Sequence, residues 1–349
     1  MTSSTWKERY ESEKIRLLGA LRRVTDGGIV EAIQHIGSTS VPGMAGAPCV
    51  DIGLAVWPFP LEAGPKSRLE ALGYQIVDGF TENPPQQCFR HESGSFQLFI
   101  LEPGVGDWYD FVLVGDYLRH NAAARDGVSV KKTNETVDKS VLFTELLPEA
   151  HTWWITHYGF SHLEAIANEW KEAAFEWYVS GGWALDLLVG RVQRVHHDVD
   201  VIVPRSAQLE LQSYLIERGW MLITPFEKRL ESWPQHMRLE LPRHQVHAHR
   251  DDTFIDILLT DMADAWRYRR EPLVLRSKEK MSLRSESGIP YLAPELVLLF
   301  KSKNTSNHER AKDQMDFEKT LPHLEPERRA WLRWALMATN PEHSWIQQL

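Results

Sequence analysis

The residues best suited to chemistry lie near the end of the stretch SGGWALDLLVGRVQRVHHDVDVIV, residues 180–203. Asp198 and Asp200 alternate with Val199 and lead into Val201-Ile202-Val203, a β-branched run that predicts a buried strand. Residues two apart on a strand face the same way, so we expect both carboxylates to point from one face. Like charges this close need a counter-charge, and a divalent cation such as Mg²⁺, which prefers oxygen ligands, supplies one.

Two glycines precede this acidic pair. Gly181 and Gly182 open the apolar segment 183–189, which predicts one or two turns of helix. Paired glycines let a phosphate-bearing ligand approach the backbone, and the amides at a helix N-terminus favour an anion. Gly-Gly alone is more often a simple turn, and Asp-x-Asp alone is a weak signal. Together they indicate a metal-carboxylate pair beside a phosphate site, which is the equipment of phosphoryl or nucleotidyl transfer.

The order of these parts resembles the signature of the polymerase-β-like nucleotidyltransferase superfamily. Fifteen residues separate Gly182 from Asp198, slightly more than that pattern has. The fuller string GGWALDLLVGRVQRVHHDVDV is similar to the aminoglycoside and lincosamide nucleotidyltransferase branch. This resemblance implies an enzyme that uses Mg²⁺ and ATP and transfers AMP to a hydroxyl of a small, antibiotic-like molecule.

A third carboxylate is expected from a later strand. Asp256 lies inside the β-prone run FIDILL, and a buried Asp without a partner is costly. We therefore predict that Asp256 folds beside Asp198 and Asp200. In the superfamily resembled, the third carboxylate helps to activate the attacking hydroxyl. Glu240 is the rival candidate, and an Asp at a strand end that faces water is the non-catalytic interpretation.

Basic residues on both sides of the acidic pair are candidates for contacting the nucleotide. Two precede the pair and two lie near the C-terminus: Arg191, Arg194, Lys301 and Lys312. Guanidinium groups suit a triphosphate, although a solvated turn explains the two arginines nearly as well. Asp313 and Asp316 are expected to pair with Lys or Arg on the surface.

Local patterns predict the elements around the site. Residues 208–218 form an amphipathic helix that ends at Gly219, and residues 220–223 and 237–241 form strands. The stretch from His244 to Asp252 contains three histidines, but their spacing fits no closed zinc site, and its polarity indicates a loop. From residue 293 onward the pattern is helical.

The first half contains a second, divergent copy of the same unit. In EAIQHIGSTSVPGMAGAPCVDIGLAV, residues 31–56, the pair Gly37-Ser38 is followed by Asp51, which enters a β-prone run. Taking Asp51 as the first acidic position places Gly53 at the second, so Asp51 stands alone. Gly37, Ser38 and Asp51 are therefore candidates for binding a ligand, with catalysis here the weaker expectation.

The string HIGSTSVPGMAG-x-P-x-x-DI resembles the GrpB family, whose members have the nucleotidyltransferase fold. FVLVGDYLRHN, residues 111–121, and Val130-Lys131-Lys132 also match, and the resemblance covers roughly residues 5–155. The family's usual Lys before the Pro is Ala47 here, so a basic residue suited to phosphate is missing. The resemblance implies a fold and leaves the chemistry of this half undefined.

Composition limits the functional classes. The 349 residues suffice for two domains, and 43% apolar with 25% charged residues is typical of a soluble globular protein. Neither half is basic, so we do not expect a nucleic-acid surface. Cys49 and Cys88 make no disulfide framework, the polar N-terminus is no signal peptide, and no apolar run spans a membrane. We therefore expect a cytoplasmic protein.

These observations predict an α+β protein with mixed sheets and two nucleotidyltransferase-fold units in tandem. The expected divisions are residues 1–160, a catalytic domain at 161–290 and a helical part at 291–349. The predicted function is Mg-dependent adenylyl transfer to a small hydroxyl-bearing acceptor, with a role in antibiotic resistance. A non-catalytic nucleotide sensor and a toxin-like enzyme acting on protein or RNA remain alternatives. The acceptor, the choice of nucleotide and the oligomeric state stay open.

Overall fold

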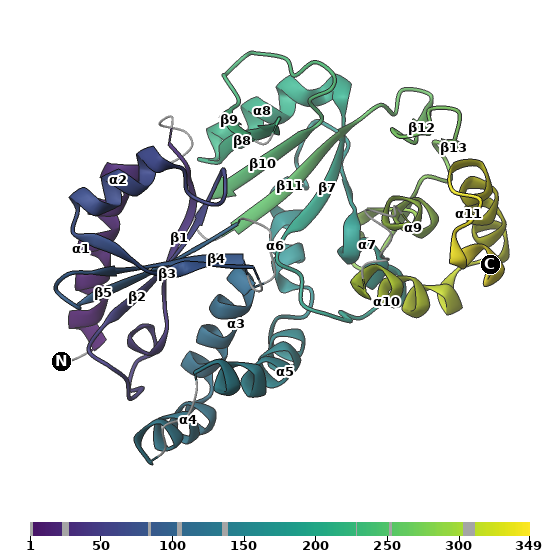
Figure 1. The fold of residues 1–349 in the computed structure, drawn as a ribbon. Helices are drawn as coiled ribbons and strands as arrows, with labels where there is room; N and C mark the ends of the chain where they lie inside the picture. The colour runs from purple at the N-terminus through teal and green to yellow at the C-terminus, as the bar shows by residue number, and fades with distance from the viewer. Residues whose placement is uncertain are drawn as a thin grey trace. The chain divides into compact units, whose positions relative to one another are not determined.

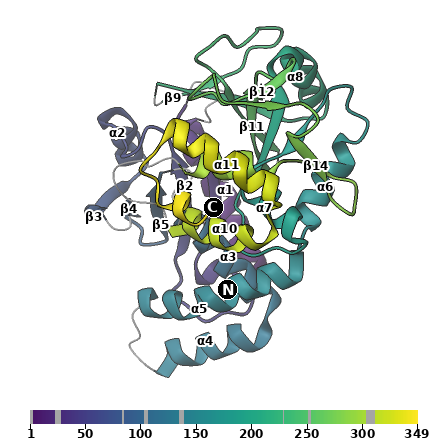
Figure 2. The same ribbon diagram turned by 90° about the vertical axis from the view of Figure 1, so that its right-hand side faces the viewer.

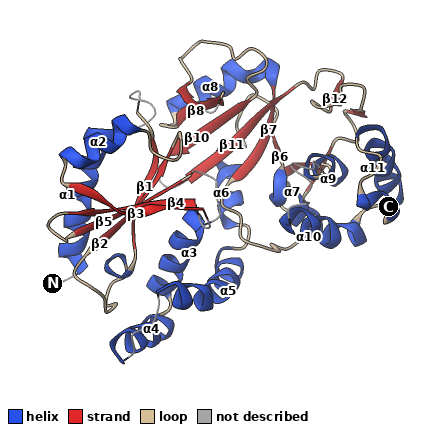
Figure 3. Ribbon diagram, viewed as in Figure 1, coloured by secondary structure: helices blue, strands red, loops and turns tan. Residues whose placement is uncertain are grey.

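The computed structural model describes residues 3–22, 28–82, 85–102, 107–134, 139–227, 229–250, 253–302 and 311–349. Its contacts divide the chain into two compact units. The first comprises Met1–His157 with Pro225–Ser232, and the second comprises Tyr158–Thr224 with Trp233–Leu349. Both units combine helices with a mixed sheet (Figures 1 and 3).

The first unit has a five-stranded sheet in the order β1-β2-β5-β4-β3. The β2 and β5 strands are parallel, and the other neighbours are antiparallel. Its elements are α1 (Ser3–Leu21), β1 (Val30–Ile36), η2 (Ser38–Ser40), β2 (Val50–Val56), α2 (Ala63–Ala71), β3 (Tyr74–Glu82), β4 (Pro85–His91), β5 (Phe96–Leu101), α3 (Asp107–His120), α4 (Ala122–Asn134) and α5 (Lys139–Tyr158).

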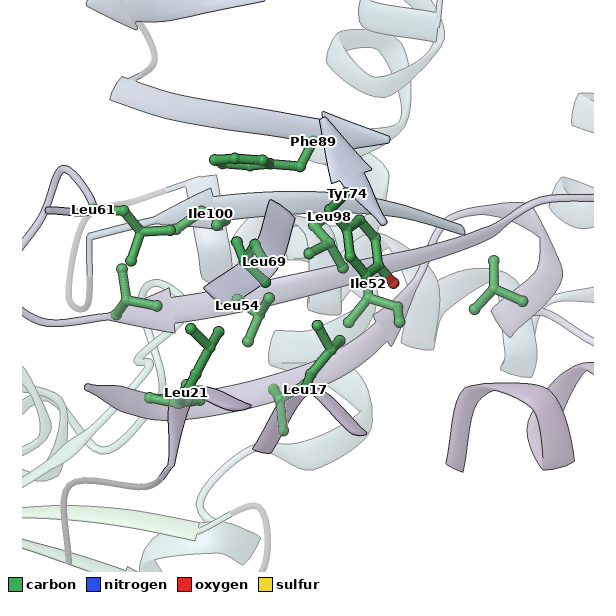
Figure 4. Packing of buried hydrophobic residues seen from close by; sticks show 14 of the residues in the cluster. Leu17, Leu21, Ile52, Leu54, Leu61, Leu69, Tyr74, Phe89, Leu98 and Ile100 are labelled. Atoms are coloured by element: carbon green, nitrogen blue, oxygen red, sulfur yellow. The ribbon is translucent and has the colours of Figure 1, made fainter. Parts of the chain in front are cut away.

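The main core of this unit lies between α1, α2 and one face of the sheet (Figure 4). Leu17 and Leu21 of α1 and Leu69 of α2 meet strand residues that alternate along the chain, such as Ile52 and Leu54. Side chains alternate across a strand, so Asp51 and Gly53, which alternate with these core residues, belong to the opposite face. The same alternation that builds the core thus places Asp51 away from it.

An eight-stranded sheet in the order β14-β15-β6-β7-β11-β10-β8-β9 and a small β12-β13 pair follow in the chain. Their strands belong to the second unit except β9 and the end of β8, which lie within Pro225–Ser232. The elements from residue 161 onward are α6 (Ser161–Trp170), β6 (Tyr178–Val179), α7 (Gly181–Val189), β7 (Val199–Pro204), η3 (Arg205–Ala207), α8 (Gln208–Glu217), β8 (Met221–Phe226), β9 (Arg229–Ser232), β10 (Gln245–Arg250), β11 (Thr253–Thr260), β12 (Ala265–Arg267), β13 (Leu275–Ser277), β14 (Ser282–Arg284), β15 (Pro290–Leu292), α9 (Pro294–Lys301), α10 (Ala311–Thr320), η4 (Leu321–His323), α11 (Pro326–Thr339) and η5 (Ser344–Gln347).

Five strands of this sheet repeat the topology of the first unit. The order β6-β7-β11-β10-β8 matches β1-β2-β5-β4-β3, because each is the corresponding strand along the chain. The strand directions also match, since β7 and β11 are parallel and the other three neighbouring pairs are antiparallel. The prediction of two units with one fold is therefore confirmed by their internal correspondence.

Two local predictions were wrong. Residues 237–241 form no strand; instead the backbone N–H of buried Leu239 donates to the Gln208 side chain, at 2.6 Å, in place of a strand neighbour. The stretch expected to be a loop from His244 contains β10. Val246 and Ala248 are fully buried and alternate with His247 and His249, so the histidines masked an ordinary strand pattern.

The helical C-terminal part packs around α9. Both α10 and α11 contact this helix (Figure 1), and α10 also contacts α7 (Figure 2). Residues Pro294–Leu299 are buried, and Pro294 starts the helix, where its missing N–H costs nothing. The carboxylate of Glu295, fully buried, accepts from Arg276 at 2.7 Å and Arg328 at 2.6 Å. Among the described helices, none is long and apolar enough to cross a bilayer.

Replacing a core residue of the first unit should lower its stability. Leu54 is completely buried, so Leu54→Ala leaves a cavity and should cost about 2–5 kcal/mol of unfolding free energy. Ile15, which is 71% exposed, provides the control, and Ile15→Ala should change stability by about 0.5 kcal/mol or less. Urea titration followed by tryptophan fluorescence measures both, and equal costs would contradict the assigned core.

Candidate functional site

The first glycine of α7 lies directly against a strand carboxylate. Ser180 follows β6 as the N-cap of α7, and its N–H donates to the carbonyl of Asp200 at 2.8 Å. Gly181 then takes a φ of +59°, and a Cβ added there would lie 1.7 Å from Asp200 Oδ2. No other residue fits, because both the backbone conformation and the space require glycine. Binding of phosphate at Gly181 and Gly182 stays a prediction.

The structure places both Asp198 and Asp256 near Asp200. Asp200 on β7 and Asp256 on β11 are register partners in a parallel pair, so they lie on one face about 5 Å apart. Asp198 immediately precedes β7, and its carbonyl accepts from Trp183 Nε1 at 2.8 Å. Glu240, the rival for the third position, is exposed and lies outside the strands. The β7–β11 register therefore selects Asp256.

The surroundings of Asp200 favour a bound cation. Its pKa is raised to about 7, mainly by burial and next by the charge of Asp198, although Lys301, Arg194 and Lys312 act in the opposite direction. Gln245 Nε2 donates to Asp256 Oδ2 at 2.7 Å, which fixes the rotation of that carboxyl group. Clustered carboxylate oxygens on neighbouring strands fit the ligand preferences of Mg²⁺. Asp198, Asp200 and Asp256 are the residues that would hold it.

A buried Asp-His pair supports the second glycine. A Cβ on Gly182 would lie 2.3 Å from a guanidinium nitrogen of Arg194 and 2.4 Å from the ring of His196. His196 stacks on Trp183 and its Nε2 lies 2.6 Å from Asp186 Oδ2. Burial lowers the His196 pKa in spite of that carboxylate. The sequence analysis missed Asp186, although a lone acid in the apolar segment 183–189 was a signal.

Two of the cations expected to contact the nucleotide, Arg194 and Lys301, bind carboxylates of α10. Asp316 accepts from Arg194 Nε at 3.0 Å and Nη2 at 3.2 Å, and lies 2.8 Å from Lys301 Nζ. Lys301 also donates to Asp313 at 3.1 Å. Both aspartates are buried, so the prediction of surface pairs was wrong in location. Arg191 and Lys312 are exposed.

The first unit repeats the glycine-carboxylate contact. Gly37 has a φ of +72°, and a Cβ there would lie 2.3 Å from Asp51 Oδ2. Asp51 therefore corresponds to Asp200, the second acid of the later unit. The sequence interpretation of Asp51 as the first acid, with Gly53 as the second, was wrong, because Asp51 occupies the second acidic position, two residues later than expected. Ser38 is packed closely, since a Cβ on Gly46 would lie 2.0 Å from its hydroxyl.

The two units share one mixed topology, and each has a glycine packed against a strand aspartate, so the chain is a tandem of one fold. The family comparisons agree with the resemblances in both halves. Residues 1–140 match the model of the GrpB protein family, and residues 162–317 match the family described as aminoglycoside-2''-adenylyltransferase.

Two relatives each match about a third of the chain. The UPF0157 protein SCO7215 of Streptomyces coelicolor is 32% identical over 120 residues, covering 34% of this chain and 60% of that protein. The UPF0157 protein BH1888 of Halalkalibacterium halodurans is 26% identical over 121 residues, 35% of this chain and 60% of that protein. The matched region thus spans less than two thirds of either relative.

Three solved structures are each similar to about half of the chain. Conserved protein GrpB from Enterococcus faecalis is 20% identical, with a TM-score of 0.35, and the match covers 42% of this chain and 92% of that one. ANT(2'')-Ia in complex with adenylyl-2''-tobramycin is 16% identical, with a TM-score of 0.36, covering 51% and 96%. Lincosamide adenylyltransferase LnuA, lincomycin-bound, is 16% identical, with a TM-score of 0.35, covering 47% and 97%.

Adding a methyl group at Gly181, the first residue of α7, should destabilise the protein more than adding one at Gly190, the C-cap of the same helix. Gly181→Ala combines an unfavourable φ with overlap on Asp200 and should cost about 2–4 kcal/mol. Gly190 also has a positive φ, +80°, but nothing lies within 4 Å, so Gly190→Ala should cost about 1 kcal/mol. Chemical denaturation measures the loss of unfolding free energy in both variants. Similar losses would show that the Asp200 carboxylate does not restrict the space at Gly181.

Neutralising Asp316 should weaken the protein in a pH-dependent way. Burial pushes the Asp316 pKa up, but the hydrogen bonds and charges of Arg194 and Lys301 outweigh it, so the pKa lies below its ordinary value. Asp316→Asn should therefore cost about 2 kcal/mol at pH 7, where the carboxylate is charged in both states. The difference from the unmodified protein should shrink below about pH 4, as the carboxyl group becomes protonated.

Urea unfolding at pH 7 and at acidic pH measures this loss. Asp261→Asn serves as the control because Asp261 makes only a distant, exposed pair with Arg267 at 3.8 Å. A cost for Asp316→Asn that is independent of pH would mean that packing, and not charge, explains it.

Proposed function

We propose that the second unit is a Mg-dependent nucleotidyltransferase that transfers AMP from ATP to a hydroxyl group of a small antibiotic. The observation that carries this proposal is the register of β7 with β11, which sets Asp256 beside Asp200 on the face reached by Asp198. Three clustered carboxylates would be unfavourable without a cation. The family match over residues 162–317 supports an antibiotic-modifying adenylyltransferase.

The roles of the carboxylates follow from their positions. Asp198 and Asp200 would hold the metal on the nucleotide, and Asp256 would contribute to the same set. The metal supplies positive charge that stabilises the attacking and leaving oxygens of an in-line displacement. Asp256, fixed by Gln245, would orient the acceptor hydroxyl and take its proton. The hydroxyl oxygen then bonds to the α-phosphorus, the bond from that phosphorus to the bridging oxygen breaks, and pyrophosphate leaves.

The helical C-terminal part would tune the charge of this site. Lys301 and Arg194 both act electrostatically on Asp200, while Asp316 binds the two cations from the other side. Their arrangement balances part of the carboxylate charge in the absence of nucleotide. Lys312, exposed at the start of α10, also acts on Asp200 and is a candidate for contacting the triphosphate. We place this activity in the cytoplasm, with nucleotide and antibiotic as partners.

Removal of a site carboxylate should abolish transfer. Asp198→Asn and Asp256→Asn should each reduce pyrophosphate release from ATP by about 100-fold or more, since each removes several kcal/mol of charge stabilisation or proton transfer. Asp264, an exposed residue outside this cluster, provides the control substitution Asp264→Asn, which should retain activity. The assay uses Mg²⁺, ATP and a panel of aminoglycosides and lincosamides, with circular dichroism to check folding.

Different outcomes identify different failures. Full activity in Asp198→Asn would overturn the carboxylate mechanism. Calorimetric binding of ATP without turnover of any acceptor would favour a sensor over an enzyme. Transfer of label from ATP into macromolecules of a lysate would favour a protein or RNA acceptor over a small molecule.

A further inference from the structure

The common topology allows the two sites to be compared position by position. Asp51 and Asp200 are equivalent because each contacts the glycine that follows the preceding strand. The residue two positions earlier, just before the strand, is Cys49 in the first unit and Asp198 in the second. Each comparison rests on contacts within one unit, so it does not depend on how the units are placed.

The third position is fixed by strand register. Asp200 pairs with Asp256 across parallel β7 and β11, and Asp51 pairs with Gln97 across parallel β2 and β5. Gln97 is thus the counterpart of Asp256. Its amide is engaged locally, because Gln97 Nε2 lies 2.9 Å from Cys88 Sγ.

The next strand of each sheet also carries different residues beside this third position. Arg90 on β4 is the register partner of Gln97, and its Nη2 lies 3.5 Å from Gln97 Oε1. The corresponding partner of Asp256 on β10 is His247. The first unit therefore presents one carboxylate, a thiol, an amide and a nearby guanidinium, whereas the second presents three carboxylates.

We propose that the first unit has lost divalent-metal binding at this position, so that all metal-dependent transfer belongs to the second unit. Mg²⁺ requires hard oxygen ligands and is usually held by more than one carboxylate, and a thiol is a poor substitute. The residues of the first site do not fit the metal that a nucleotidyltransferase fold implies, and no reaction step is assigned to it. This inference deepens the proposed function and rests on it only for the role of the second unit.

Binding of Mn²⁺ as a probe for Mg²⁺ tests the inference in the full chain without any acceptor. Electron paramagnetic resonance counts the ions bound by the unmodified protein, by Asp198→Asn with Asp200→Asn, and by Asp51→Asn. We expect the double variant to lose specific binding and Asp51→Asn to retain it. Residual binding that the further substitution Asp51→Asn removes would overturn the inference.

Restoring the missing carboxylates gives an independent arm. Cys49→Asp with Gln97→Asp, made in the Asp198→Asn and Asp200→Asn background, should create Mn²⁺ binding that Asp51→Asn abolishes. Cys49→Asn with Gln97→Asn is the neutral control of similar size and should bind nothing. A folded carboxylate variant that still fails to bind would overturn the assignment of these two positions.

The two arms separate this inference from the proposed function. Absence of Mn²⁺ binding in the unmodified chain would contradict the metal site of the second unit, and the restoration arm would still decide the first. Loss of binding in the double variant without any pyrophosphate release would leave the assignment of the metal intact while refuting transfer to the acceptors tested.

Discussion

The contact between a positive-φ glycine and a strand carboxylate is the constraint on which both sites depend. In each unit the chain leaves one strand, turns at Gly37 or Gly181, and returns on the neighbouring strand with Asp51 or Asp200 against that glycine. A Cβ at either glycine would overlap the carboxylate, so the turn and the acid are fixed together. The strand register then determines which residue can lie beside the acid.

What differs between the units is built on that shared frame. The three-residue η2 follows Gly37, whereas the nine-residue α7 begins at Gly181 itself. The longer helix provides Trp183 and Asp186, which hold His196 and thereby the loop that leads to Asp198. The second unit thus positions an additional acid, and the C-terminal helices add Lys301 and the Asp316 carboxylate that binds Arg194.

The sequence predicted the parts of the fold in which local pattern and tertiary position agree. The β-branched run after Asp200 and the run around Asp256 became β7 and β11, and the amphipathic pattern at 208–218 became α8. It failed at β10, where histidines on one face hid buried Val246 and Ala248 on the other. Residues 237–241 looked like a strand, but the Gln208 side chain provides the hydrogen bond that Leu239 needs.

The site itself was predictable to the extent that its members share a motif. Asp198 and Asp200 are marked by their spacing, and Asp256 by its placement in an apolar run, but only strand register decides between Asp256 and Glu240. Ion pairs between residues far apart in the chain could not be predicted from local sequence patterns. Arg194 and Asp316 are separated by 122 positions, and neither has a neighbour in sequence that indicates the other.

That separation has a consequence for synthesis on the ribosome. The glycine, the acidic pair and Asp256 leave the ribosome before α10, so at about 5–20 residues per second the acidic cluster exists for several seconds without Asp316 to anchor its cations. The earlier sheet, whose strands all lie between residues 30 and 101, is complete long before then. Nascent chains would thus acquire a finished N-terminal sheet first, and the later unit would reach its final charge balance only when its last helices emerge.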